Sequence, residues 1–290
     1  MKLLACVLLT FFCANGAYIQ NHAHLAPVIF SPVNQAFNEK LEERILGGTV
    51  VLENELPYIV AIFFQESISG ENTGFCGGSL ISERHVLTAA HCVKDYTYAE
   101  VVLGTLQALN PESQGYLKVR SSELKAHEAF ERPRLNDDIA LITLSAGVPA
   151  QNNIRPIPLP TENSVSPGDR AVVAGWGKIN DDPSGYLNDN LLKVDVVIAD
   201  LEVCRGSYGS TYINDTKLCV ETNGGSIGTC HGDSGTALAT AQELGAGKVQ
   251  IGIMSFGSSD GCESGFPNVY TRVDRYLQWI ADNGGPSVQA

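Results

Sequence analysis

The sequence predicts an all-β fold, and two features carry this prediction. From Ile45 onward, short apolar or alternating runs of six to nine residues recur, and their richness in Val and Ile is typical of strands. Turn-forming Gly and Pro separate the runs, and 29 of the 290 residues are Gly, above the usual ~7%. Regular short strands joined by such turns indicate a barrel or a sandwich.

Six runs illustrate the predicted strands. In chain order they are YIVAIFF (58–64), AEVVLG (99–104), DIALITL (138–144), RAVVAGWG (170–177), LLKVDVVIA (191–199) and VQIGIMSFG (249–257). The segment 154–169 contains four prolines, so we expect an extended connector between two halves of the fold. Only the C-terminal end is predicted to be helical, because Tyr276, Leu277 and Ile280 recur at helical spacing before a pair of glycines.

The N-terminus has the layout of a secretory signal peptide. A single lysine precedes an apolar run from Leu3 to Cys13, and small residues follow, so we expect cleavage after Gly16 or Ala17. The run is too short to cross a bilayer, which needs about 20 apolar residues. The sequence therefore predicts a secreted, extracellular protein with a signal peptide over 1–17 and no membrane anchor.

Cysteine number and net charge narrow the class of protein. Six of the eight cysteines remain after removal of the signal peptide, and an even number in an exported chain indicates disulfides, although six cysteines allow 15 pairings. No C-x-x-C or H-E-x-x-H spacing predicts a metal site. The formal net charge of −13 argues against a nucleic-acid partner, because phosphate binding needs a basic surface.

Three short stretches carry residues suited to nucleophilic catalysis. They are TAAHC around His91, NDDIAL around Asp138 and GDSG around Ser234. A serine needs a base to take its proton, and the base needs a carboxylate that orients it and offsets its developing charge. Glycines beside the serine also permit a sharp turn, which would aim the backbone N–H groups of Gly232 and Ser234 at one oxyanion. Each stretch alone is weak evidence for an active site. The three together, in the order His, Asp, Ser, are much stronger evidence.

Together with ILGG, CGGSLI, GWG, SFGSSDGC and PNVYTRV, these stretches resemble the chymotrypsin-like (trypsin-fold) serine endopeptidases from Ile45 to about Asn283. The resemblance implies two six-stranded antiparallel β-barrels with a C-terminal helix, the first supplying His91 and Asp138 and the second Ser234. It also implies a monomer without cofactor or metal. Its partners would be polypeptide substrates and protein protease inhibitors.

Two neighbouring carboxylates precede the same apolar run. The family motif places the catalytic aspartate directly before Ile-Ala-Leu, which selects Asp138. Asp137 is then expected to point away along the strand into solvent.

The resemblance also explains the stretch ERILGG. In this family, cleavage after a basic residue frees an amino terminus that folds inward and pairs with the carboxylate beside the catalytic serine. Here these residues would be Arg44, Ile45 and Asp233. We therefore expect a trypsin-like activating protease, a propeptide over 18–44 that leaves after cleavage, and a peptidase domain over 45–290.

The resemblance implies disulfides and a substrate pocket as well. The residue six positions before the serine forms the pocket floor, and here it is the uncharged Gly228, with Asn268 as a neutral polar neighbour. Ser255, Phe256 and Gly257 would form the wall. An aromatic or large aliphatic side chain is therefore expected before the scissile bond, in a pocket similar to those of collagenolytic arthropod proteases. The implied disulfides are Cys76–Cys92, Cys204–Cys219 and Cys230–Cys262.

One departure from the family pattern leaves alternatives open. Most relatives continue GDSGGP, whereas this chain has Thr236 and Ala237. Since β-branched Thr does not easily adopt a positive φ, either the backbone is ordinary there or the oxyanion turn is altered. An altered turn would favour a catalytically silent relative that acts as a binding or regulatory module.

Overall fold

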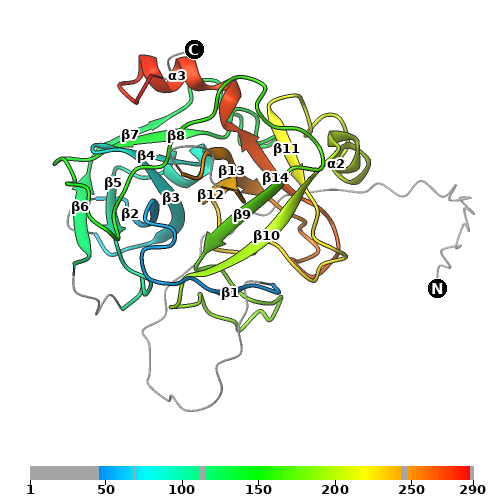
Figure 1. The fold of residues 1–290 in the computed structure, drawn as a ribbon, viewed down its shortest axis with the longest axis horizontal. Coiled ribbons are helices and arrows are strands. Elements are labelled where there is room, and N and C mark those ends of the chain that lie inside the picture. Colours follow the sequence, from blue (N-terminus) through cyan, green and yellow to red (C-terminus); the bar gives the residue numbers. More distant parts are fainter. Residues whose placement is uncertain (1–45, 68–69, 111–114, 243–246, 288–290) are drawn as a thin grey trace, which may run out of the picture.

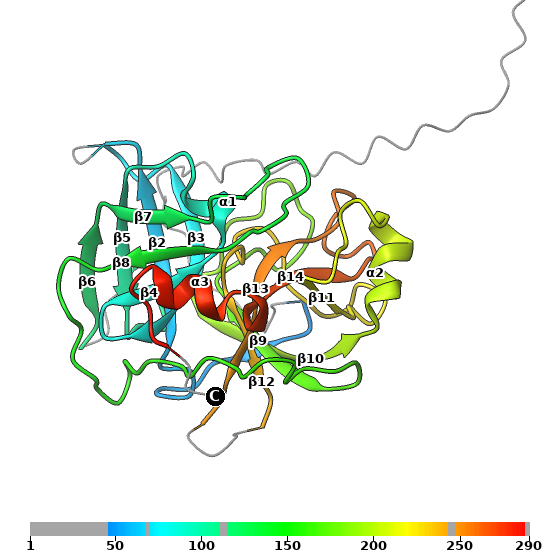
Figure 2. The same ribbon diagram turned by 90° about the horizontal axis from the view of Figure 1, so that it is seen from above.

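The computed structural model describes residues 46–67, 70–110, 115–242 and 247–287, which form two β-sheets lying side by side (Figures 1 and 2). The predicted signal peptide and propeptide, with Arg44 and Ile45, lie outside the described residues. Within the described residues, no helix is long and apolar enough to cross a membrane.

The first sheet is antiparallel, and the two strands at its edges follow one another directly in the chain. Its strands are β2 (Ile59–Gln65), β3 (Gly74–Ser82), β4 (His85–Thr88), β5 (Tyr98–Leu103), β6 (Leu117–Ser121), β7 (Glu123–Ala126) and β8 (Ala140–Thr143), in the order β6-β5-β2-β3-β4-β8-β7. A single residue separates β6 from β7, so these two are one bent strand that pairs first with β5 and then with β8. Counted in this way, the barrel has six strands, as predicted.

The second sheet closes through its own hydrogen bonds. It contains β1 (Thr49–Val50), β9 (Arg170–Gly175), β10 (Leu192–Ala199), β11 (Lys217–Val220), β12 (Ala237–Thr240), β13 (Gln250–Phe256) and β14 (Asn268–Arg272). Because β9 pairs with both β10 and β12, six of these strands form a closed barrel, and β1 adds to the edge of β10. The prediction of two six-stranded antiparallel barrels is therefore confirmed.

Apolar burial explains why these runs form strands. Nearly every residue of β2 and β3 is buried, and Ile62 and Phe64 have no exposed surface. A separate cluster inside the second barrel includes Val173, Leu238 and Tyr270. The connector 154–169 holds no helix or strand. Near its start, the Ile157 N–H donates to the Leu80 carbonyl of the first barrel. Near its end, the Gly168 N–H donates to the Ile198 carbonyl of the second barrel.

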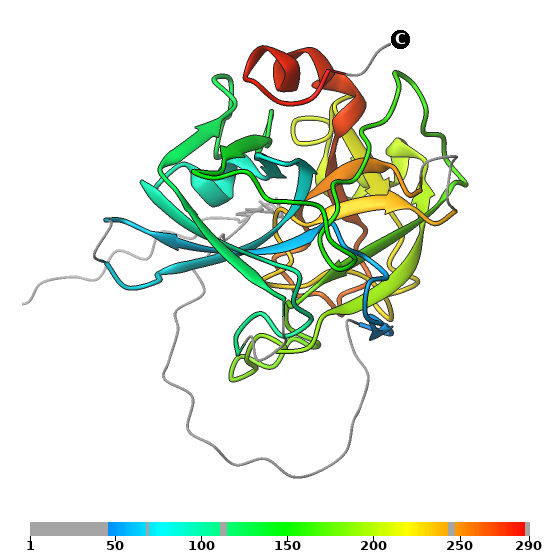
Figure 3. The same ribbon diagram turned by 60° about the vertical axis from the view of Figure 1, so that its left-hand side comes forward.

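The helices differ in part from expectation. The C-terminal helix is present as the 3-10 turn η1 (Val273–Arg275) followed by α3 (Leu277–Asp282), drawn in red at the C-terminal end in Figure 3. It returns to the first barrel, where the rings of Trp279 and His127 pack at a tilt with their centroids 5.1 Å apart. The expectation that only the end is helical was wrong, because α2 (Leu201–Tyr208) is also present. Asp200 caps α2 by accepting the Glu202 N–H, and Gly209 ends it at a positive φ.

Candidate active site

His91 and Asp138 form a hydrogen-bonded pair where the two barrels meet. His91 lies on the one-turn helix α1 (Ala90–Val93), directly after β4 and Ala89. Its ring Nδ1 is 2.8 Å from Asp138 Oδ2, and its backbone N–H donates to Asp138 Oδ1 at 2.9 Å. Two contacts on one carboxylate fix both the position and the orientation of the imidazole, as a base held by a carboxylate requires.

The carboxylate of Asp138 is fully buried and remains ionised. The second barrel supplies two hydroxyl groups, because Ser255 Oγ donates to Asp138 Oδ2 at 2.6 Å and Thr271 Oγ1 donates to the Asp138 carbonyl at 2.9 Å. Burial alone would raise the pKa of the Asp138 carboxyl, but the charge of His91 and the hydrogen bonds from His91 and Ser255 lower it overall. A buried anion is therefore available to offset positive charge on His91.

Asp137 does not behave as the sequence predicts. The strand β8 begins only at Ala140, so the residues before it do not alternate across a sheet. Asp137 takes a positive φ of 51° and is only partly exposed, and its Oδ1 accepts a hydrogen bond from the phenol hydroxyl (Oη) of Tyr276 at 2.9 Å. The expectation of a solvated Asp137 is corrected accordingly, because this carboxylate ties the turn that carries Asp138 to the C-terminal segment.

Ser234 lies in a tight turn packed against the segment that leads into α1. Its carbonyl accepts the Gly77 N–H at 2.8 Å, and the next residue, Gly235, has φ +79°. A Cβ on Gly235 would lie 2.2 Å from Thr88 Oγ1, so only glycine allows this approach. The turn thus brings Ser234, which is partly exposed, beside the His91 segment. His91 Nε2, the atom that would take the serine proton, is buried, and among the described residues it has no hydrogen-bond partner, the Ser234 hydroxyl included.

Two backbone N–H groups of this turn are available to an oxyanion. Gly232 takes φ +99°, and Asp233 N–H donates to the Cys230 carbonyl at 3.0 Å, which closes the turn. Within the described part of the chain, no acceptor is found for the N–H of Gly232 or Ser234. Such free donors beside a nucleophile can stabilise the charge of a tetrahedral intermediate.

Thr236 does not distort the turn. Its φ is not positive, and it leads directly into β12 with its hydroxyl donated to the Ala174 carbonyl at 2.5 Å. Its side chain is buried against Gly77, where an added Cβ would lie 2.8 Å from Thr236 Cβ. Of the two alternatives left open by the sequence, the structure therefore has the ordinary backbone, which removes the reason to expect a silent relative.

Asp233 is a buried carboxylate with two backbone donors. Gly177 N–H donates to its Oδ1 at 2.8 Å and Cys230 N–H to its Oδ2 at 2.9 Å, and its exposed fraction is 1%. Burial raises the pKa of Asp233 to about 6, although both hydrogen bonds act to lower it. No cationic side chain among the described residues forms an ion pair with it. Among the described residues, this buried carboxylate is therefore without an ion-pair partner.

The uncleaved protein is expected to lose stability as pH rises from about 4 to about 6. Over this range folded Asp233 still holds its proton while the unfolded side chain has released it, so the folded state binds more protons and stability falls with pH. A shift of about two pKa units corresponds to about 3 kcal/mol. Denaturant unfolding at pH 4, 5, 6 and 7 measures this loss. Asp233→Asn should remove it, and an equal pH dependence in that variant would contradict the assignment.

The first described residue lies next to the expected activation site. Leu46 is 6% exposed and forms an antiparallel bridge with Gly228, two residues before Cys230. A Cβ on Gly47 would lie 2.6 Å from the Ser226 carbonyl oxygen, so Gly47 also approaches this segment closely. Leu46 and Gly47 therefore pack against the 226–228 segment of the second barrel, which precedes the turn that contains Asp233.

The expected pocket residues gather around one neutral side chain. Asn268 is 3% exposed and accepts the Thr229 N–H at 3.0 Å. Its amide lies between Gly228 and Gly257, since a Cβ on Gly228 would be 2.5 Å from Asn268 Oδ1 and one on Gly257 would be 3.0 Å from Asn268 Nδ2. Gly228 has φ +133°, which strains any larger residue. The floor therefore carries an amide and no charge.

The remaining pocket residues have separate surroundings. Ser255 is buried against Asp138, so it supports the catalytic pair from the wall. Phe256 is 7% exposed and packs edge-on against Tyr208, with ring centroids 5.4 Å apart. Beyond Gly257, a small cavity is lined by Tyr208, Tyr212 and Phe266. Aromatic rings therefore contribute much of the lining of this cavity.

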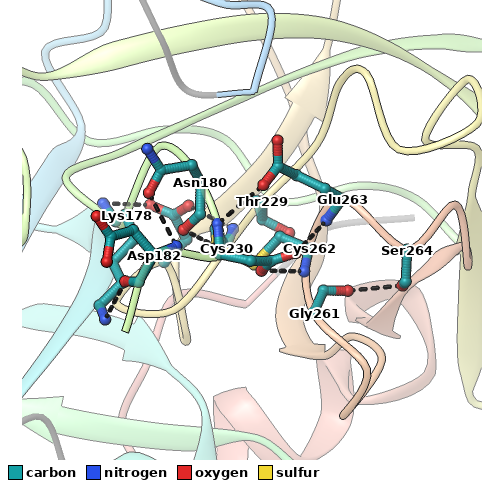
Figure 4. The surroundings of a disulfide bond; sticks show 12 residues. Lys178, Asn180, Asp182, Thr229, Cys230, Gly261, Cys262, Glu263 and Ser264 are labelled. Carbon is teal, nitrogen blue, oxygen red and sulfur yellow. Dashed lines mark hydrogen bonds between the residues drawn. A yellow bond between two sulfur atoms is a disulfide. The ribbon is translucent and has the colours of Figure 1, made fainter. Parts of the chain in front are cut away.

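All three expected disulfides are present, namely Cys76–Cys92, Cys204–Cys219 and Cys230–Cys262. The third joins the serine turn to the loop after Gly257, and Figure 4 shows it beside Asn180 and Glu263. Asp181 reinforces this junction, because it accepts the N–H groups of Cys262 at 2.6 Å and Glu263 at 2.9 Å. The pocket entrance is thus held by covalent and polar links together.

One charged residue near the catalytic pair was not anticipated from the sequence. Lys217 begins β11, is 1% exposed, and reaches the hydroxyl groups of Ser255 and Thr271. The only sequence signal is a lysine at the start of the four-residue run KLCV, whose other members are apolar. A single lysine at a strand end is usually solvated, so the sequence alone could not place it inside.

Comparisons with known proteins agree with this geometry. A family model described as Trypsin matches residues 45–280. Brachyurin of Leptuca pugilator is 34% identical over 83% of this chain and 99% of its own length. Trypsin-1 of Astacus astacus is 35% identical over 82% and 99%, and chymotrypsin-C of Rattus norvegicus is 35% identical over 85% and 91%. The solved structure of HL collagenase has a TM-score of 0.73 at 31% identity and covers 84% of this chain and 100% of that one.

Proposed function

The chain belongs to the trypsin family of serine endopeptidases, and we propose that it is secreted as a zymogen, activated after Arg44, and selective for large hydrophobic or aromatic residues before the scissile bond. The observation that carries the selectivity is the uncharged floor formed by Gly228 and Asn268. An Arg or Lys side chain would find no carboxylate there. An apolar side chain would be buried against apolar groups and glycine backbone.

The chemistry follows from the catalytic pair and the serine turn. Ser234 Oγ attacks the scissile carbonyl carbon while its proton passes to His91 Nε2, and Asp138 offsets the charge that forms on the imidazole. The oxyanion is received by the N–H groups of Gly232 and Ser234. His91 then gives its proton to the leaving amine, and water hydrolyses the acyl-enzyme by the same steps in reverse. The contact of His91 Nδ1 with Asp138 supports this role, because it leaves Nε2 as the ring nitrogen that can accept the proton.

Secretion and activation rest on the N-terminal sequence together with Asp233. The signal-like segment 1–17 and three disulfides favour an oxidising, extracellular location. Arg44 lies two residues before Leu46, which bridges to Gly228, so a trypsin-like protease would release an ammonium group at Ile45, and the buried Asp233 is its proposed partner. The partners proposed are therefore polypeptide substrates, that activating protease, and protein protease inhibitors.

The selectivity is tested by profiling the trypsin-activated protein on a peptide library. Wild type is expected to prefer Phe, Tyr or Leu before the cut. Asn268→Asp keeps the shape of the side chain and adds a charge at the floor, so cleavage after Arg or Lys should rise about 10- to 100-fold, the worth of one charge-assisted pair. Gly228→Asp is the poorer variant, because the backbone there has φ +133° and its Cβ would collide with Asn268.

Asn268→Leu is the matched control, since it changes the floor without adding charge. It should not increase cleavage after Arg or Lys. A wild-type preference for basic residues, or an equal gain in both variants, would show that the floor lies elsewhere.

A further inference from the structure

Lys217 is a buried cation that the reaction steps above do not use. It is among the largest fully enclosed side chains, although lysine is almost never fully buried unless it is paired. A buried ammonium without partners is costly, so its surroundings must compensate the charge. The contacts of Lys217 show which groups compensate its charge and which groups it can position.

Two of its contacts, to the hydroxyl groups of Ser255 and Thr271, lead on to Asp138. The Lys217 ammonium donates to the Leu135 carbonyl and lies 3.4 Å from Ser255 Oγ and 3.5 Å from Thr271 Oγ1. It also lies 5.9 Å from the centre of the Phe256 ring, within cation–π range. No carboxylate within the described residues pairs with it directly. The anion nearest along this network is Asp138, which accepts from Ser255 itself.

The direction of these hydrogen bonds is fixed by the ammonium. An ammonium only donates, so Ser255 Oγ and Thr271 Oγ1 must accept from Lys217 with their lone pairs. Each hydroxyl then has one proton left to donate. Ser255 gives it to Asp138 Oδ2 at 2.6 Å, and Thr271 gives it to the Asp138 carbonyl at 2.9 Å. The lysine thus orients both hydroxyl groups toward the catalytic aspartate.

The ammonium also acts on the segment that precedes Asp138. Leu135 is buried with φ +51°, a conformation that costs energy for a residue with a branched side chain. Its carbonyl is the acceptor for Lys217. The same cation therefore holds the backbone three residues before the carboxylate and the hydroxyl groups around it.

We propose that Lys217 is a positioning residue of the catalytic pair: its ammonium orients Ser255 and Thr271 on Asp138 and, as a nearby positive charge, opposes protonation of His91. The proposal rests on the proposed catalytic role of this pair. A base must be neutral to accept the serine proton. The cation therefore extends activity toward lower pH, because it makes the imidazolium form less favourable.

The charged groups around Lys217 favour its protonated, positively charged form. Asp138 and Asp137 lie on the segment before β8, and Tyr276 holds Asp137. His91 faces Asp138 from α1. Burial lowers the pKa of Lys217 to about 8, against the opposing effect of the two aspartates. The ammonium is thus charged over the acidic and neutral range.

The test compares the pH dependence of kcat/KM in activated wild type, Lys217→Met and Lys217→Gln. Removal of the charge should move the acidic midpoint of the profile upward by about one pH unit in both variants. Lys118→Met is the matched control, because this lysine is exposed on β6 and pairs with Glu100 in the first barrel. Its acidic midpoint should not move. A purely structural role of Lys217 would lower kcat/KM without shifting the midpoint, and that result would overturn the proposal.

A second readout does not depend on activity. In a Ser234→Ala background, the ring protons of His91 are followed by NMR as pH changes, with and without Lys217→Met. An upward shift of the titration midpoint supports the proposal even if the protein hydrolyses nothing, and an unchanged midpoint overturns it. If the Lys217 variants do not fold, lysine labelled with 13C at Cε in the unmodified protein decides the matter. A charged Lys217 at pH 6 supports the proposal, and a neutral amine refutes it.

Discussion

Replacing Ser234 with Ala is expected to reduce kcat by about 10⁴- to 10⁶-fold, leaving only the residual hydrolysis that binding and oxyanion stabilisation provide. The change removes the oxygen that forms the acyl-enzyme, and the other serine of this network, Ser255, is buried with its hydroxyl donated to Asp138. Initial rates on a peptide with Phe before the scissile bond, after activation with trypsin and its removal, measure the loss.

The fold should survive this substitution, which makes the result interpretable. The Ser234 carbonyl, and not its hydroxyl, accepts the Gly77 N–H, so the turn keeps its hydrogen bond in the variant. Ser166→Ala, at an exposed position in the connector, is the matched control and should retain wild-type turnover. A serine-directed irreversible probe should label wild type and not Ser234→Ala. Unchanged turnover in Ser234→Ala would refute the assignment of the nucleophile.

The strands that the sequence predicts are those whose side chains enter a core. Runs such as 58–64 and 249–257 match β2 and β13 within about one residue, because burial of Val, Ile and Phe decides their conformation. The run 138–144 matches less well, because β8 starts only at Ala140 and the first two residues of the run belong to the turn that carries Asp138. The strands β6 and β7 have sequences LKVRS and ELKA, in which charged residues alternate on an exposed face. Their weak apolar pattern does not distinguish them from loops.

The glycine beside the expected nucleophile could be predicted because local backbone geometry constrains it. The approach of Gly235 to Thr88 requires a residue without a side chain, which leaves a mark in the sequence. Asp137 and Lys217 leave no such mark. The place of Asp137 depends on Tyr276, 139 residues away, and that of Lys217 on Leu135, 82 residues away. Tertiary contacts between distant segments decided both, and a single sequence does not reveal them.

Cleavage after Arg44 is expected to raise activity by about 100- to 1000-fold, and Arg44→Gln should prevent this rise during trypsin treatment. Asp233 is buried with two backbone donors and no cationic partner among the described residues. Removal of one partner from a buried ion pair costs about 3–5 kcal/mol, which is enough to decide whether the serine turn is populated in its active form. The ammonium freed at Ile45 would supply the missing partner, since Leu46 already lies beside Gly228.

Two variants separate cleavage from pairing. Arg44→Lys is the matched control, because trypsin still cuts after lysine, and it should activate as wild type does. Asp233→Asn should be cut normally and stay weakly active, because the new terminus then finds no charge. Mass spectrometry beside an activity time course follows both events. Full activity while the Arg44–Ile45 bond is intact would rule out the switch.

The loss of activity of the cleaved enzyme at alkaline pH is an independent test of the proposed ion pair between the Ile45 amino terminus and Asp233. A free α-amino group has a pKa near 8, and pairing with the Asp233 carboxylate stabilises its charged form and raises that value. The contribution of the pair is therefore complete below pH ~8 and is lost as pH rises through the higher, folded-state value. Activity of the cleaved wild type should fall over that range. Cleaved Asp233→Asn should show no such fall, since it lacks the carboxylate that gives the terminus its effect.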